Sequence, residues 1–209
     1  MNENKTVIQK AVTLISEGLF KEAIEELRSF LENHPESIEG WYNLGYALTE
    51  TEEFDEAVKA YDEALAIDNF IFEIWFNKGA VLYALKDFEK AKDCYEEALD
   101  IDDVDAEAWN NLGNCLSRLA EGPAAIEAYT RAVALDPEYA EAFYNKANAH
   151  FIEEQDEQAV AYAELALQLN PDLNNLVSQW ISVSRDRLAS KKDEEEHLKR
   201  IRRESDKQD

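Results

Sequence analysis

The segment WYNLGYAL at residues 41–48 returns, with substitutions, three more times along the chain. Its counterparts are WFNKGAVL at 75–82, WNNLGNCL at 109–116 and FYNKANAH at 143–150, each 34 residues after the one before. Another row of positions keeps the same step: Ala23, Ala57, Ala91, Ala125 and Ala159. A fixed period of this length indicates a repeat architecture in which each unit is one supersecondary element.

Two runs of helical spacing lie within the second repeat. Apolar and small residues between 41 and 48 step by three and four, which places them on one face of a helix over about Ile38–Thr51. A second run predicts a helix over about Phe54–Ile67, and the small residues Gly45 and Ala57 allow the two helices to approach closely. One hairpin cannot bury its apolar surface alone, so neighbouring hairpins must stack. The sequence therefore predicts an all-α protein.

The repeated order of Trp, Leu-Gly, Tyr, Ala, an aromatic residue, Ala and Pro resembles the tetratricopeptide repeat (TPR). This resemblance implies a right-handed α-solenoid whose concave side is lined by the first helix of each unit. The first unit is the most divergent, with Val7 in the Trp place. The five contiguous units are expected at 4–37, 38–71, 72–105, 106–139 and 140–173.

The C-terminal part of the chain differs from the repeats in composition. Residues 174–190 have one apolar face and are expected to form a capping helix, with Trp180 packed on the last unit. Residues 191–209 should be a charged tail, either helical or disordered. The segment 174–209 carries nine Lys and Arg against eight Asp and Glu, so it alone is not acidic. It either folds back on the acidic body, meets an acidic partner, or stays solvated without a role.

The charge and the cysteines limit the classes of function. The net charge of −25 repels phosphate, so it disfavours nucleic acid and anionic membranes and favours basic proteins or peptides, unless the acidity serves solubility alone. No run approaches the roughly 18 apolar residues that a membrane span needs. The start lacks an apolar signal core, and Cys94 and Cys115 lack CxxC spacing, so we expect a cytoplasmic protein with reduced, buried thiols.

Side chains on the first helix of each unit would form the partner-binding groove that the resemblance implies. Asparagine amides both donate and accept hydrogen bonds to a peptide backbone, and Tyr and Phe offer rigid apolar contact area. The densest amide cluster combines residues 110–114 with Asn145 and Asn148, although asparagine at this place also steadies neighbouring helices in the family. The predicted groove residues are Tyr42, Asn43, Tyr46, Phe76, Asn77, Tyr83, Asn110, Asn111, Asn114, Arg118, Tyr144, Asn145, Asn148 and Phe151.

The same helices disfavour one function of the family, which is to hold a C-terminal carboxylate with Lys and Arg. The second residue of every unit after the first is acidic, whereas Lys5 takes this place in the first unit, so a ligand with basic and apolar residues is favoured. These acidic residues are Glu39, Glu73, Glu107 and Glu141. No phosphate-binding Gly-rich loop, HExxH or GxSxG motif occurs, so we expect no enzyme, no cofactor and no metal. The sequence predicts a non-catalytic protein-interaction scaffold, with a structural assembly subunit or a weakly self-associating protein as the alternative.

Overall fold

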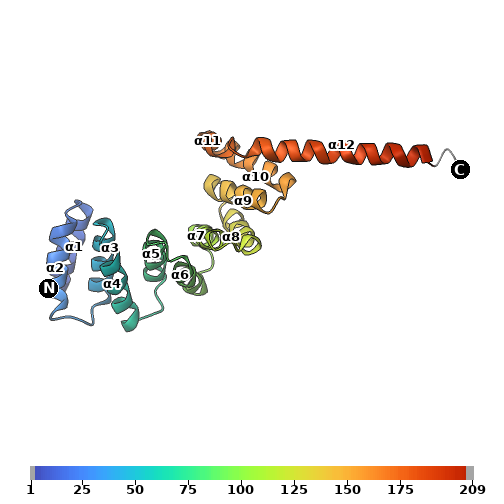
Figure 1. Ribbon diagram of the computed structural model, residues 1–209. Coiled ribbons are helices and arrows are strands. Elements are labelled where there is room, and N and C mark those ends of the chain that lie inside the picture. Colours follow the sequence, from blue (N-terminus) through green and yellow to red (C-terminus); the bar gives the residue numbers. More distant parts are fainter. Residues whose placement is uncertain (1–2, 206–209) are drawn as a thin grey trace. The chain divides into compact units, whose positions relative to one another are not determined.

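The protein is all-α over residues 3–205, the part that its computed structural model describes (Figure 1). The predicted fold class is confirmed, because no strand occurs in this stretch. The helices are α1 (Glu3–Ser16), α2 (Phe20–Leu31), α3 (Ile38–Glu50), α4 (Phe54–Ile67), α5 (Phe72–Ala84), α6 (Phe88–Ile101), α7 (Ala106–Arg118), α8 (Gly122–Leu135), α9 (Ala140–Ile152), α10 (Asp156–Leu169), the 3-10 helix η1 (Pro171–Leu173), α11 (Asn174–Val177) and α12 (Ile181–Ser205).

The helices belong to two compact units, Met1–Leu119 and Ala120–Asp209, which are described separately. In unit 1, α1 pairs with α2, α3 with α4 and α5 with α6, and each hairpin packs on the next. The first helices of successive repeats, α1, α3, α5 and α7, also contact one another in order. In unit 2, α8 packs on α9, α9 pairs with α10, and α12 packs on α10. The stacking of hairpins that defines a helical solenoid is therefore present inside unit 1.

The repeated glycines mark close contacts between the two helices of one hairpin. A Cβ atom at Gly45 of α3 would lie 2.7 Å from Cε1 of Tyr61 on α4. At Gly79 of α5, the equivalent distance to Cε1 of Tyr95 is 3.1 Å. The tyrosine rings are buried against the glycine backbone, so a side chain at either glycine would displace a ring. This contact explains why Gly and Tyr repeat together with a period of 34.

The turn inside each hairpin uses one residue in the left-handed backbone region. Its φ is +74° at Gly18, and it lies between +55° and +64° at four non-glycine residues. These five positions are also 34 residues apart, although Gly, Glu, Lys, Ala and Glu occupy them in turn. Left-handed φ costs an L-residue about 1–2 kcal/mol, so the hairpin packing must hold these turns in place. The four non-glycine residues are Glu52, Lys86, Ala120 and Glu154.

The loops between repeats explain the tryptophan row. The indole Nε1 of Trp41 donates a hydrogen bond of 2.8 Å to the carbonyl oxygen of Pro35, six residues earlier. Trp75 and Trp109 make the same bond, also of 2.8 Å, to the carbonyls of Asn69 and Asp103. Just before these loops, a carboxylate or amide oxygen accepts from the backbone N–H two residues on, which closes a turn. This second row, also with a period of 34, consists of Asp68, Asp102, Asp136 and Asn170.

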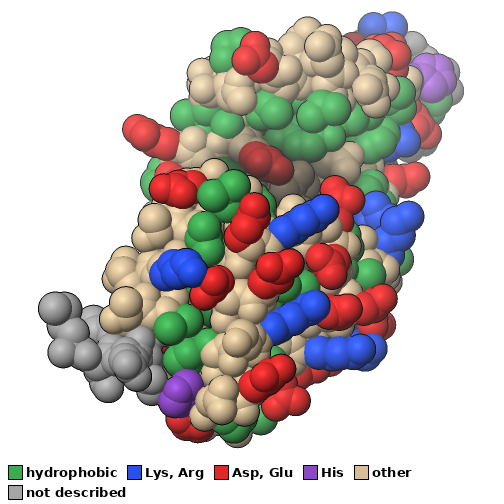
Figure 2. Space-filling model, turned by 90° about the vertical axis from the view of Figure 1, so that its left-hand side faces the viewer, with side chains coloured by type: hydrophobic (Ala, Val, Ile, Leu, Met, Phe, Trp, Pro, Cys, Tyr) green, Lys and Arg blue, Asp and Glu red, His purple; other side chains and the backbone are tan. Residues whose placement is uncertain are grey.

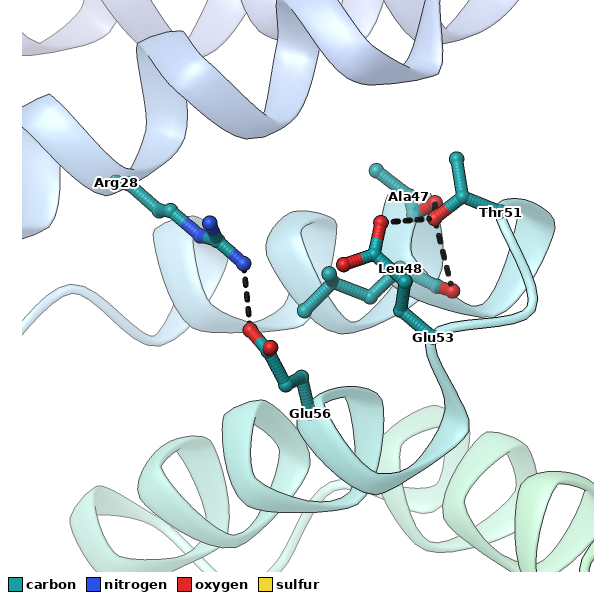
Figure 3. Close-up of polar contacts among 6 residues, drawn as sticks. All are labelled: Arg28, Ala47, Leu48, Thr51, Glu53 and Glu56. Atoms are coloured by element: carbon teal, nitrogen blue, oxygen red, sulfur yellow. Dashed lines mark hydrogen bonds and ion pairs between the residues drawn. The ribbon is translucent and has the colours of Figure 1, made fainter.

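Polar contacts lie at the C-terminal end of helix α3, and an ion pair connects neighbouring hairpins (Figure 3). The hydroxyl of Thr51, which follows α3, lies 3.2 Å from the carbonyl oxygens of both Ala47 and Leu48. It also lies 3.0 Å from the carboxylate of Glu53, so three acceptors share its one proton. Arg28 of α2 forms an ion pair with Glu56 of α4, which joins the first two hairpins. Both partners are exposed, so this pair adds at most about 1 kcal/mol.

The C-terminal helix begins as a cap on unit 2. Trp180 is buried and stacks on Phe151 with 5.0 Å between ring centroids, which confirms the prediction that Trp180 packs on the last repeat. Arg187 of α12 reaches the buried carboxylate of Asp156 at 3.3 Å and also covers the Phe151 ring. The same helix continues without a break to Ser205. One helix therefore spans part of the predicted cap and most of the predicted tail.

Candidate protein-binding surface

The predicted groove residues lie on the first helices of four repeats. Those on α3, α5 and α7 belong to unit 1, where these three helices lie in order against one another. Those on α9 belong to unit 2. The predicted amide cluster is therefore divided between the units. Asn110, Asn111 and Asn114 lie in the first, and Asn145 and Asn148 lie in the second. All four groove residues on α9 are partly buried: Tyr144, Asn145, Asn148 and Phe151.

Unit 1 contains a pocket of about 180 Å³ formed by α5, α6 and α7. Three predicted residues line it, namely Tyr83, Asn111 and Asn114. Ala80 and the buried Tyr95 complete its wall. The pocket therefore presents two amide side chains beside aromatic surface, the combination that suits a peptide backbone and an adjoining side chain.

A cation and two aromatic rings lie beside this pocket. The Tyr83 ring meets Phe88 edge-on, with 5.2 Å between centroids. The guanidinium of Arg118 lies 4.7 Å from the centroid of the Phe88 ring. Burial raises the pKa of Tyr83, and the charge of Arg118 partly opposes that shift. The Tyr83 hydroxyl is therefore a neutral hydrogen-bonding group near pH 7.

The amides of Asn43 and Asn77 have hydrogen-bond partners within the protein. The Nδ2 of Asn77 donates to the Tyr42 hydroxyl at 3.2 Å, a bond from α5 to α3. The Nδ2 of Asn43 donates to the carbonyl oxygen of Glu39, 2.6 Å away on its own helix. These bonds agree with the alternative role of such asparagines, which is to steady neighbouring helices. Asn110 is only 1% exposed, so we correct its assignment and exclude it from the contact surface.

The predicted aromatic anchors differ in how freely a ligand could reach them. Tyr46 is the most open of them at 37% exposed. Phe76 is partly buried between Phe72, on which it stacks, and the edge of the Tyr95 ring. Phe151 stacks beneath Trp180, so the chain itself occupies it, and its assignment as a partner contact is corrected.

A second pocket, of about 320 Å³, lies between the first turns of α3 and α5. Its apolar wall consists of Ile38, Ile71 and Ile74. The sequence did not predict them as contact residues, because they lie outside the family's contact positions and follow the pattern of core residues. Exposed Glu39 and Glu73 stand at its edge, and the charge of Glu73 contributes to raising the pKa of Tyr42, after the larger effect of burial. The residues that line this pocket are Ile38, Glu39, Tyr42, Ile71, Glu73 and Ile74.

The second-place glutamates are exposed on every first helix after α1. They lie in the first turn of each helix, where the helix dipole stabilises a negative charge. Figure 2 shows acidic side chains spread over the face in view, with Lys and Arg side chains set among them. In one ion pair of unit 1, the Nζ of Lys10 lies 2.6 Å from the carboxylate of Glu26. Two of these glutamates, Glu39 and Glu73, line the pocket between α3 and α5, whereas the residues that line the pocket of Tyr83, Asn111 and Asn114 include no acidic one.

The described residues also bear on thiol chemistry, on metal binding and on membrane insertion. Burial raises the pKa of the Cys94 thiol to about 11 and that of Cys115 to about 12, so both are protonated and unreactive near pH 7. Among the side chains of residues 6–202, no group of three His, Cys, Asp or Glu is arranged to hold a metal ion. No helix in that stretch is long and apolar enough to cross a bilayer.

Comparisons with known proteins agree with this architecture. Tetratricopeptide repeat models match residues 8–70, 72–103, 106–139 and 140–173. No curated protein matches the sequence.

Three similar solved structures share this fold at low sequence identity. MamA from Desulfovibrio magneticus RS-1 is 23% identical, with a TM-score of 0.77 over 82% of this chain and 97% of that chain. YrrB, described as a TPR protein with an unusual peptide-binding site, is 24% identical, with a TM-score of 0.73 over 79% and 86%. Pseudomonas aeruginosa pilF is 22% identical, with a TM-score of 0.67 over 87% and 88%. At these identities the likeness concerns the fold alone, while the repeat rows and the matched models show that this chain belongs to the tetratricopeptide repeat family.

Proposed function

We propose that the chain is a non-catalytic scaffold that binds a peptide or helix of another protein on the first-helix face of its repeats. The ligand presents basic and apolar residues. In this proposal, residues 4–173 act as five repeat units, residues 174–190 cap the array, and residues 191–209 form the tail. The observation that carries the proposal is the pocket lined by Tyr83, Asn111 and Asn114.

The pocket supports a peptide ligand for two physical reasons. Two amides on one helix, α7, can bond to successive polar groups of an extended backbone, which has a donor and an acceptor at each residue. The Tyr83 ring offers apolar contact area at little cost in side-chain entropy. The description of YrrB as a protein with a peptide-binding site points in the same direction.

Charge supports the basic character of the ligand. Exposed glutamates stand in the first turns of α3, α5 and α7, and the whole chain carries −25. Such a surface attracts cationic segments and repels acidic ones, and the effect weakens as salt rises. The position of Arg118 beside Phe88 leaves one cation near the pocket, where it suits a backbone carbonyl or carboxylate of the ligand.

A peptide-display selection against the purified chain tests this proposal. We expect enriched peptides to carry Lys or Arg beside aliphatic residues. Replacing Asn111→Ala with Asn114→Ala should weaken the selected peptides about 5- to 150-fold, because two hydrogen bonds of about 0.5–1.5 kcal/mol each are lost. The matched control, Asn33→Ala with Asn69→Ala, removes two exposed amides that lie outside the first helices and should leave affinity unchanged.

Two results would contradict the peptide-binding proposal. Peptides that bind the Asn111→Ala and Asn114→Ala variant with the affinity of the wild type would reject this pocket as the site. A selection dominated by acidic peptides would reject the charge argument. Circular dichroism at 222 nm would verify that each variant keeps its helical content. The alternative role, self-association, would use a different pocket, which lies between α3 and α5.

A further inference from the structure

The last part of α12 is a helix without a packing partner in the described chain. Near its start, Ile181 and Ser184 are buried against unit 2, and Arg187 bonds to Asp156. From residue 191 to residue 202, every side chain is exposed. Single helical segments of this length are marginally stable in water, because most helical stability in proteins comes from packing an apolar face. We therefore expect a partner surface to cover and stabilise this exposed part of the helix.

The exposed segment has a distinctive chemistry. Leu198 and Ile201 are 47% and 49% exposed and are three residues apart, so they share one face of the helix. Arg202 lies four residues after Leu198 on that face, and Lys199 lies at its edge. In a chain of net charge −25, residues 197–203 contain four Lys and Arg and no Asp or Glu. Residues 193–196 just before it are all acidic, and Lys199 forms an ion pair with Glu195 at 3.8 Å. Only the end of the helix therefore has the basic and apolar character that the acidic repeats favour.

The pocket between α3 and α5 offers the complementary surface. Its wall consists of Ile38, Ile71 and Ile74, and its volume of about 320 Å³ leaves room for aliphatic side chains. Neither the Glu39 nor the Glu73 carboxylate forms an ion pair with a described residue of the chain. Two unpaired carboxylates beside an apolar hollow match two cations beside an apolar pair.

We propose that α12 of one copy docks on unit 1 of a second copy. Leu198 and Ile201 enter the isoleucine-lined pocket, while Lys199 and Arg202 meet Glu39 and Glu73. The two surfaces lie on different parts of the sequence, so the contact is head-to-tail, and a pair of copies keeps one free pocket and one free helix for further copies. This interface uses none of Tyr83, Asn111 and Asn114, although it shares the acidic first turns of α3 and α5 with the proposed peptide site.

Sedimentation equilibrium of the full chain at 50 mM salt tests this interface. The average mass should rise above 23.9 kDa as protein concentration increases. Glu39→Lys with Glu73→Lys, or Lys199→Glu with Arg202→Glu, should each raise the dissociation constant at least tenfold, because attractive pairs become repulsive. An equimolar mixture of the two variants should regain association, because each supplies the surface that the other lacks.

Matched controls separate docking from general effects of charge and folding. Glu107→Lys with Glu141→Lys makes the same charge change at the same helix position, with the same loss of a favourable dipole interaction, but outside this pocket. Lys21→Glu with Lys59→Glu changes the net charge as the helix variant does, at two exposed lysines of the repeats. Both controls should associate like the wild type.

Three results would overturn the proposal. The first is a mass of 23.9 kDa at every concentration, which would also be the outcome if the helix met the pocket of its own chain. The second is association that the two charge reversals do not weaken. The third is equal weakening by the matched controls. Because the display selection reads a different pocket, loss of this interface would leave the peptide-binding proposal standing, and the reverse also holds.

Discussion

The contact between Gly45 and Tyr61 allows a quantitative test of the hairpin packing. In Gly45→Ala, the new Cβ would lie 2.7 to 2.9 Å from three atoms of the Tyr61 ring. Observed Cβ contacts are longer than 3.0 Å, so the ring must move. Tyr61 is fully buried and its hydroxyl lies 3.5 Å from that of Thr49, so the ring has no open space to enter. Gly79→Ala is the matched comparison, because its Cβ would lie 3.1 to 3.2 Å from the Tyr95 ring, which needs a shift of only a few tenths of an ångström.

The two substitutions should change the free energy of unfolding by different amounts, although both replace glycine with alanine. Alanine favours a helix interior over glycine by about 1 kcal/mol. Overpacking a buried contact costs about 1–3 kcal/mol. We expect Gly79→Ala to be nearly neutral, because the two effects cancel, and Gly45→Ala to lose about 1–2 kcal/mol. In a chain of this size, that loss lowers the melting temperature by about 2–8 °C.

Thermal melts at 222 nm measure the difference between the variants. Repeat arrays need not unfold in one step, so hydrogen exchange of α3 and α4, compared with α5 and α6, would locate the loss. We expect faster exchange in α3 and α4 of Gly45→Ala alone. A Gly45→Ala variant as stable as the wild type, or a Gly79→Ala variant that is the less stable of the two, would refute the packing of tyrosine on glycine.

Three further predictions concern the turns, the loops and unit 2. Ala120→Gly should stabilise the chain by about 0.5–1 kcal/mol, seen in urea unfolding, because glycine relieves the left-handed strain but loses more entropy on folding. Trp41→Phe should cost about 1 kcal/mol in the same assay, because it removes the bond to the Pro35 carbonyl, and an unchanged midpoint would contradict this. Burial lowers the pKa of His150 below its usual 6.5, and nearby Lys146 adds to the shift, whereas the Gln155 hydrogen bond opposes it. Below pH 6.5 the unfolded state takes up the proton first, so stability should fall with acidification in the wild type more steeply than in His150→Gln.

Much of the fold follows from the sequence because its periodic rows report contacts that recur in every repeat. The tryptophan, glycine and tyrosine rows each correspond to one hydrogen bond or one packed ring in the structure. The left-handed turn residues could not be predicted in this way. Glu52, Lys86 and Ala120 share a backbone conformation but no side-chain chemistry, because the packing of the hairpin imposes the conformation from outside.

The candidate site was less predictable than the fold, because family contact places give a direction for a side chain but not its partners. Asn77 points as expected, yet its amide is engaged with Tyr42. Phe151 would face a ligand if the chain ended with the repeats, but Trp180 stacks on it. Conversely, Ile38 and Ile71 pack against the core, as their pattern indicates, yet they also line a surface pocket together with the buried Ile74. Which side chains remain free depends on contacts between helices, and these appear only when neighbouring repeats are assembled.

The joint between α12 and the last repeat is built differently from the contacts between repeats. All four buried polar side-chain atoms that lack a hydrogen-bond partner among the described residues lie at this end of the chain: Nε2 of His150, Oδ2 of Asp156, Nε1 of Trp180 and Oγ of Ser184. Leaving a buried polar group unsatisfied costs about 1–3 kcal/mol, so these atoms offset part of the stability gained by burying Trp180 and Ile181. Only the ion pairs to Asp156, from Arg187 at 3.3 Å and Lys191 at 3.6 Å, compensate directly. These unsatisfied groups weaken the joint, and a partner that covers the exposed end of α12 would stabilise the helix where the repeats do not.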